Sequence, residues 1–217
     1  MNIIAIIPAL DSNNYSPLGD LNSWGDTTLL EWKVSQLSLV DKIDRIIIST
    51  DSDKIKRVAD KINIEVLNRG KSMELDEAII HACSNLELDN HILWANPTFP
   101  FMDQHIFLKL IDNYIEEDMP DDGIVTSRLV QEYLFTEEGP LNFNDNSIVT
   151  RKDLEHIYML TNAAYIAKCE LIKSRGKIFG KNPVFFNTSW LASLEISKSH
   201  DIDMFSDLIS KYFKEQL

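Results

Sequence analysis

The 217-residue sequence predicts an α/β protein, a three-layer α/β/α sandwich built on a mainly parallel sheet. Short apolar runs rich in Ile and Val alternate with amphipathic segments of helical length, and the connections between them are short. The first run, residues 3–7, is uninterrupted by polar side chains and ends at Pro8, as expected of a strand buried on both faces. A hydrophobic content of 44% is enough for one sizeable core, so we expect a single domain over residues 1–217.

Five strands and the helices between them are predicted in order along the first 130 residues. The strands lie at residues 3–7, 43–49, 64–67, 91–95 and 123–129, and the helices at residues 29–39, 53–61, 75–86 and 102–117. The last of these helices is the clearest, because its apolar residues Phe107, Leu110, Ile111, Tyr114 and Ile115 share one face. Ligands in such sheets bind beyond the carboxyl ends of the strands.

Residues 131–152 interrupt this alternation. The segment is polar and contains Gly139, Pro140 and a cluster of Asn and Asp, which predicts an excursion with one or two short strands. The chain then returns to the sheet at residues 159–167, forms a short helix at 168–174 and a short strand at 184–187, and ends in a helix at 203–213.

Composition excludes several classes of function. The net charge of −13 disfavours nucleic acid as a partner, because phosphate backbones are bound by clustered Lys and Arg. No run of 18 apolar residues predicts a membrane span, and the apolar start of the chain is too short and lacks the basic flank of a signal peptide. The two cysteines are far apart and unpatterned, so we expect a reduced, cytoplasmic protein.

The first 32 residues contain no Lys and no Arg, and the first basic side chain is Lys33. This stretch is a predicted strand, a loop and a helix start, which is the usual place for an α/β enzyme to hold phosphates. The loop carries Asp11, Asp20 and Asp26 instead of cations, which would repel a polyphosphate. With only seven glycines in the chain, a Gly-rich phosphate loop is also excluded.

Asp201-Ile202-Asp203 is the strongest candidate for a metal site. On an extended segment the two carboxylates lie on one side, and hard oxygen ligands at that spacing suit Mg²⁺. The alternative is that Asp203 caps the last helix and Asp201 is solvated.

Further candidates follow the predicted strands. Asn96, held in a turn by Pro97 and Pro100, is placed to meet a ligand or to bond its own backbone. Arg69 and Arg151 follow a strand and the excursion, each with a lysine beside it, and each is either a ligand contact or a surface charge. Asp51 and Ser52 are candidates to cap the helix at residues 53–61.

Four stretches, in order, resemble the cytidylyltransferases that activate acid sugars, the CMP-sialic acid (acylneuraminate) and CMP-Kdo synthetases. Residues 30–32 and 44–52 resemble the family's LLEW…IDRIIVSTDS, and residues 93–101 its LLQPTSPL. Residues 151–154 with 161–166 resemble RQDLP…NGAIYI, and residues 201–203 with 207–208 resemble DIDTEEDL. Together they span nearly the whole chain.

The resemblance implies a Rossmann-like fold of the nucleotide-diphospho-sugar transferase type and transfer of CMP from CTP to an acid sugar such as a sialic acid or related nonulosonic acid. By the same resemblance Asp201 and Asp203 would hold Mg²⁺ and serve catalysis, and Pro8, Ala9 and Arg69 would contact the nucleotide. The sugar side would be lined by the residues Asn96, Thr161 and Tyr165, with Asn162 in place of Thr161 in an alternative register. Family members commonly dimerise through the segment matching residues 131–152, so we expect a homodimer.

The departures from the family pattern fall mainly in the first loop. Leu10 stands where the family has Arg, and no lysine follows before Lys33, while Asn96 replaces a Gln and Met102 an Arg. Losing one preorganised cationic donor typically costs about 10²–10³ in rate. Arg69, Lys71, Arg128, Arg151 or a partner subunit are the possible replacements. The sequence is therefore consistent with an active nucleotidyltransferase, with a catalytically degenerate binding or assembly partner in surface-polysaccharide synthesis, or with an Asp-x-Asp glycosyltransferase.

Overall fold

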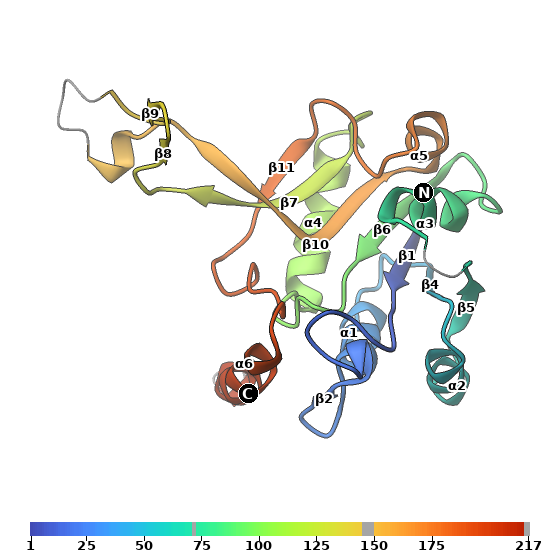
Figure 1. Cartoon of the computed structure of the whole chain (residues 1–217). Coiled ribbons are helices and arrows are strands. Elements are labelled where there is room, and N and C mark those ends of the chain that lie inside the picture. The colour runs from blue at the N-terminus through green and yellow to red at the C-terminus, as the bar shows by residue number, and fades with distance from the viewer. Residues whose placement is uncertain (71–72, 145–149, 215–217) are drawn as a thin grey trace.

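A computed structural model describes residues 1–70, 73–144 and 150–214. Its central sheet has seven strands in the order β11-β7-β10-β6-β1-β4-β5 (Figure 1). Every neighbouring pair is parallel except the two that involve β10, which is antiparallel to both β6 and β7. The bounds of the strands are β1 Asn2–Pro8, β4 Arg45–Thr50, β5 Glu65–Asn68, β6 Asn90–Ala95, β7 Ile124–Val130, β10 Ile157–Lys168 and β11 Val184–Asn187.

Helices cover both faces of this sheet, which confirms the predicted three-layer sandwich. On one face α1 (Leu29–Ser38), α2 (Asp53–Lys61) and α4 (Gln104–Glu116) share a core with the alternate β1 residues Ile3, Ala5 and Ile7. On the other face α3 (Leu75–Cys83) and α5 (Cys169–Arg175) share a second core with Ile4 and Ile6. The uninterrupted apolar run of β1 therefore serves two cores, as its sequence pattern predicts.

Local capping sets where the helices begin. Thr28 and Glu31 form a reciprocal capping box at the start of α1, with the Glu31 N–H 3.2 Å from Thr28 Oγ1. Ser52 accepts from two backbone N–H groups at the start of α2, so the capping interpretation of that stretch is confirmed. Asp103 caps α4, which therefore begins two residues later than the apolar pattern predicts.

The excursion, residues 131–152, leaves the sheet on the ends of β7 and β10 and lies apart from the helices (Figure 1). It contains the short pair β8 (Phe135–Thr136) and β9 (Gly139–Pro140) and a 3-10 turn, η2 (Arg151–Asp153), in agreement with one or two short strands. Residues 145–149 lie outside the described part of the chain.

The remaining elements are a 3-10 turn, a small hairpin and the last helix. A 3-10 turn, η1 (Gly19–Leu21), precedes a small hairpin of β2 (Ser23–Trp24) and β3 (Thr27–Thr28). The last helix, α6 (Ser199–Lys214), packs Phe205 and Ile209 against Trp24 and Phe101 in a third core cluster. No helix in the described ranges has the length and apolar character needed to cross a membrane.

Candidate active site

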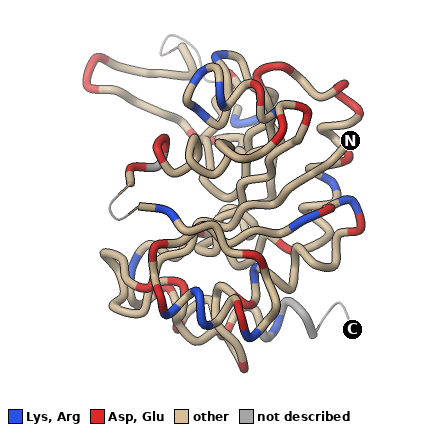
Figure 2. The backbone as a smooth tube through the Cα atoms, turned by 90° about the vertical axis from the view of Figure 1, so that its right-hand side faces the viewer, with Lys and Arg blue, Asp and Glu red and all other residues tan. Residues whose placement is uncertain are grey.

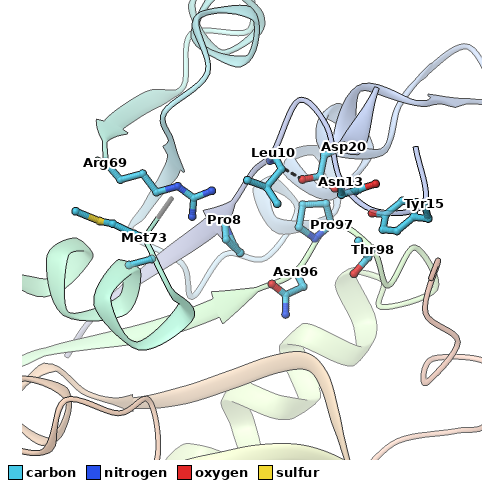
Figure 3. A pocket seen from close by; sticks show the side chains of 11 residues that line it. Pro8, Leu10, Asn13, Tyr15, Asp20, Arg69, Met73, Asn96, Pro97 and Thr98 are labelled. Atoms are coloured by element: carbon cyan, nitrogen blue, oxygen red, sulfur yellow. Dashed lines mark hydrogen bonds between the residues drawn. The ribbon is translucent and has the colours of Figure 1, made fainter. Parts of the chain in front are cut away.

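A cavity of about 310 Å³ opens beyond the carboxyl ends of β1, β5 and β6, the edge at which a parallel sheet is expected to bind ligands (Figure 3). We call it the strand-end cavity. Three of the predicted site residues, Pro8, Arg69 and Asn96, meet there although they are far apart in sequence. Its described lining is Pro8, Leu10, Asn13, Tyr15, Asp20, Arg69, Met73, Ala78, Asn96, Pro97 and Thr98.

The loop after β1 folds back on itself through Leu10 and Asp20. The Asp20 N–H donates to the Leu10 carbonyl at 2.8 Å, and Asp20 Oδ2 accepts the Leu10 N–H, also at 2.8 Å. Gly19 makes this close approach possible, because it has φ +51° and lies against the Leu10 carbonyl. The Asp20 carboxyl is 3% exposed, and burial raises its pKa to about 7 against the opposing effects of the Leu10 N–H and Arg69.

Arg69 is the cation of the cavity among its described lining residues. Its backbone N–H donates to Thr50 O at 3.0 Å, and its guanidinium donates to Ala9 O at 3.4 Å, across the end of β1. Burial lowers the pKa of Arg69, and the nearby Asp51 and Asp20 carboxylates oppose this shift. A half-buried guanidinium with its remaining N–H groups toward the cavity is suited to hold an anion. Ala9 takes part through its backbone, since its side chain is fully buried.

Lys33, the first basic residue, does not supply the missing charge. It is 0% exposed, and its ammonium donates to Phe99 O at 2.9 Å and Met102 O at 3.3 Å while lying 4.9 Å from the centre of the Phe107 ring. Burial lowers its pKa to about 7, with Asp103 opposing the shift. Its role is to fix the turn that carries the cavity residues after β6.

Thr161 and Asn162, the two alternatives that the sequence leaves open, lie in different surroundings in the structure. Thr161 is 4% exposed and its hydroxyl donates to Thr126 Oγ1 at 2.9 Å, at an irregularity where the pairing of β10 with β7 shifts. Asn162 is exposed, and its backbone carbonyl accepts from the Asn96 side-chain amide. The Tyr165 hydroxyl donates to Asn162 Oδ1, and burial raises the pKa of Tyr165 to about 12. Asn96, Asn162 and Tyr165 therefore form one connected group, and Thr161 lies outside it.

Asp201-Ile202-Asp203 is helical, so the prediction of an extended segment is wrong. The segment lies in the first turn of α6, where residues two apart point about 200° away from each other. Asp201 is 7% exposed and its Oδ2 accepts the N–H groups of Ser197 and Lys198 at 2.9 and 2.8 Å, whereas Asp203 is exposed. The two carboxylates do not face one cation in this arrangement. Within the described ranges, moreover, no three His, Cys, Asp or Glu side chains are grouped to hold a metal ion.

Asp201→Ala is expected to destabilise the protein by about 1–2 kcal/mol, because it removes the acceptor for two N–H groups at the start of α6. Asp203→Ala is the matched control, since it removes the same charge from an exposed position and should change stability by less than about 0.5 kcal/mol. Urea unfolding of both variants measures the difference. Equal stability of the two variants would contradict a capping role for Asp201.

The other candidates to replace the missing cations of the first loop either lie away from the strand-end cavity or lie outside the described residues. Arg151 pairs with Glu132 at 2.9 Å on the excursion, and Arg128 lines a separate cavity beside Trp190. Lys71 lies outside the described residues. Acidic and basic residues are interspersed along the backbone (Figure 2).

Sequence reasoning missed two groups near the strand-end cavity. Tyr15 lines it, and burial raises the pKa of its hydroxyl further above the usual range. Glu195 is a half-buried carboxyl whose charge acts on both Tyr15 and Tyr165, and burial raises its pKa. Glu195 is brought there by the next residue, Ile196, whose N–H donates to Thr98 O at 2.8 Å. Neither residue belongs to a motif, so no signal along the chain marks them.

Comparison with known proteins gives both a family and a fold. Residues 5–214 match the model of a family described as cytidylyltransferase. None of the curated proteins matches the chain. Similar solved structures include the 4-diphosphocytidyl-2C-methyl-D-erythritol synthase from Anaerococcus prevotii DSM 20548, with TM-score 0.71 and 17% identity over 96% of this chain and 98% of that one.

Two further solved structures are similar. A CMP:2-keto-3-deoxy-manno-octonic acid synthetase complexed with CTP has TM-score 0.78 and 8% identity, over 98% of this chain and 100% of that one. The bifunctional IspDF from Campylobacter jejuni has TM-score 0.69 and 14% identity, over 94% of this chain and 54% of that one. At these identities the likeness shows a shared fold.

Proposed function

Because the chain belongs to the cytidylyltransferase family, we propose that it transfers CMP from CTP to a hydroxyl group of an acid sugar such as a sialic acid or a related nonulosonic acid. The acceptor oxygen attacks the α-phosphorus of CTP, the bond from that phosphorus to the bridging oxygen breaks, pyrophosphate leaves, and the hydroxyl proton passes to water. The observation that carries the proposal is Arg69, a half-buried guanidinium held across the end of β1 beside Asn96 in the strand-end cavity.

The residues divide between the two substrates by position. Arg69 and the backbone at Pro8 and Ala9 would hold the nucleotide, since they surround the end of β1. The group of Asn96, Asn162 and Tyr165 supplies amide and hydroxyl donors and acceptors for a sugar, and Asn162 replaces Thr161 in that role because its side chain is exposed.

A deficit of positive charge limits the rate that this site is expected to reach. Phosphoryl transfer depends on positioning and on neutralising phosphate charge, and each missing donor costs about 10²–10³ in rate. We propose that CTP enters as its Mg²⁺ complex, with the ion held by the phosphates, because Asp201 and Asp203 do not converge on one position. Bound there, the ion would supply part of the missing neutralisation.

Pyrophosphate release tests the proposal. The protein is incubated with CTP, Mg²⁺ and a panel of nonulosonic acids, and release above the rate without sugar is expected for at least one acid. A parallel series with ATP, GTP and UTP tests the base. Absence of sugar-dependent release with every acid, together with no binding of CTP, would contradict the proposal.

A catalytically silent binding partner is the second candidate, favoured by the acidic loop after β1, where Asp11 pairs with Lys54 at 3.7 Å and Asp20 faces the cavity. Calorimetry discriminates the two: micromolar CTP binding without turnover supports the silent protein, and binding with turnover supports the enzyme. A glycosyltransferase of the Asp-x-Asp type is not favoured, because Asp201 and Asp203 point apart in α6.

For the enzyme and for the silent protein alike we propose a cytoplasmic location, consistent with the free, buried thiols of Cys83 and Cys169.

We also propose a homodimer formed through the excursion. Phe143 contacts both Tyr133 and Phe135 there, each with ring centroids 5.2 Å apart, and Phe135 is 67% exposed. Such a projecting aromatic cluster is typical of a protein interface.

The dimer predicts a response to charge on the excursion. Phe135→Glu is expected to shift the sedimenting species from dimer to monomer, since burying a carboxylate at an apolar interface is unfavourable. Leu39→Glu is the control, because Leu39 is equally exposed, at 66%, but follows α1 away from the excursion. A monomer for the unaltered protein at micromolar concentration would contradict the proposal.

A further inference from the structure

Of the two oxygens of the Asp20 carboxyl, one accepts a hydrogen bond from a described residue and the other does not. Its Oδ2 accepts the Leu10 N–H, which fixes the group at the end of β1, but its Oδ1 is buried and has no hydrogen-bond partner among the residues that the structure describes. The residue is 3% exposed and lines the strand-end cavity. An ionised carboxylate in such a position loses its hydration without gaining hydrogen bonds in exchange, and the free-energy cost is high. A protonated carboxyl in the same position costs far less.

The charged and titratable groups around Asp20 do not offset this cost. Arg69 faces it through space, but its guanidinium donates to Ala9 O and is shared with Asp51. Tyr15, from the same loop, is held neutral by burial, and Glu195 faces Tyr15 from the segment before α6. Within the described part of the chain, Arg69 is therefore the one cation whose charge acts on Asp20, and it also interacts with Asp51.

An anion in the cavity would shift the balance further. A phosphate group brings negative charge beside Asp20, and like charges disfavour each other's ionisation. The pKa of Asp20 is already raised to about 7 by burial, so little more is needed to protonate it near neutral pH. By linkage, a ligand that favours protonation is itself bound more tightly by the protonated protein.

We propose that Asp20 takes up a proton when the strand-end cavity binds a phosphate-bearing ligand, and that its protonation sets the affinity for that ligand. This inference rests on the proposed function in taking CTP as the ligand. Proton uptake would explain how an acidic loop without cations can bind a polyphosphate. When Asp20 becomes neutral on binding, its repulsion of the phosphate groups is removed. Affinity for CTP should then fall as pH rises above about 7, by about tenfold per pH unit for one linked proton.

Calorimetric titration with CTP and Mg²⁺ from pH 6.5 to 9 tests this in three proteins. Asp20→Asn keeps an oxygen acceptor for the Leu10 N–H but has no proton to take up, and Asp26→Asn removes the same charge from an exposed position in the turn between β2 and β3. The unaltered protein and Asp26→Asn should lose affinity with rising pH. Asp20→Asn should stay nearly flat and bind more than about tenfold tighter than the unaltered protein at pH 8.5. Protonation of the nucleotide itself changes the affinities of both variants equally and cancels in their ratio. Equal slopes of CTP affinity against pH for Asp20→Asn and Asp26→Asn would therefore overturn the inference.

Proton uptake gives a second readout that needs no variant. The heat of binding at pH 8 is compared in two buffers of different ionisation enthalpy, and uptake of nearly one proton is expected. No uptake would overturn the inference even if Asp20→Asn fails to fold. If CTP does not bind, the proposed function fails, and inorganic tripolyphosphate becomes the probe: binding with uptake supports the role of Asp20, and no uptake or no binding overturns it.

Discussion

Gly19→Ala is expected to lower the free energy of unfolding by about 3–5 kcal/mol. At φ +51° a side chain is strained, and an added Cβ would lie 2.2 Å from the Leu10 carbonyl oxygen and 2.7 Å from the Ser12 nitrogen. Backbone atoms cannot move aside as a flexible side chain can. The Leu10 carbonyl also accepts the Asp20 N–H, so its displacement would break the pairing that shapes the strand-end cavity.

Gly25→Ala is the matched control for this change. Gly25 has nearly the same backbone angle, φ +59°, but no atom of the described residues lies within 4 Å of an added Cβ. It should therefore show the conformational strain alone, about 1 kcal/mol. Urea unfolding measures both variants, and equal losses would contradict a close approach between Gly19 and Leu10. CTP binding should weaken for Gly19→Ala only.

Arg69→Gln is expected to weaken CTP binding about 100-fold, close to 3 kcal/mol. It removes the cation of the described cavity lining and leaves the Asp20 and Asp51 carboxylates without their shared counter-charge. Calorimetry with CTP and Mg²⁺ gives the dissociation constant, and pyrophosphate release gives the corresponding loss of kcat/KM.

Arg57→Gln separates a local contact from a general effect of charge. Arg57 is exposed on α2, so its replacement changes the net charge equally and should alter CTP affinity by less than about twofold. Thermal unfolding of both variants checks that neither loses its fold. Equal weakening by the two changes would show that Arg69 acts only through the overall field of the protein.

Local patterns predicted the elements well because their causes are local. Residues 53–61 were predicted as a helix and α2 spans Asp53–Lys61, since Ser52 caps its first turn and Ile55 and Ala59 are buried on one face. The sequence predicts that the last helix starts at Asp203, but α6 starts at Ser199, because the side chain of Asp201 accepts the N–H groups of the two residues before the helix. Because the capping residue lies inside the helix, the apolar pattern of the sequence does not mark where the helix starts.

The candidate site was predictable only in part. Pro8 ends one strand, and Arg69 and Asn96 each follow another, so the meeting of strand ends at one edge of a parallel sheet predicts that the three lie together, as they do in the strand-end cavity. Thr161 could not be separated from Asn162 by sequence, because an irregularity in β10 decides which of them turns inward. Tyr15 and Glu195 were missed, since their positions depend on how a loop and the segment before α6 close over the cavity.

The sequence by itself determined the α/β architecture, the strand ends at which the candidate site is sought and the absence of Lys and Arg before residue 33. These follow from hydrophobic periodicity and composition, which are properties of the chain read in order. Only the tertiary structure decided that Lys33 is buried under a turn, that Asp201 and Asp203 point apart, and that the charge of Arg69 acts on a buried Asp20. Ionisation and ligand binding depend on burial and on charges brought together from distant segments, and those exist only after the chain has folded.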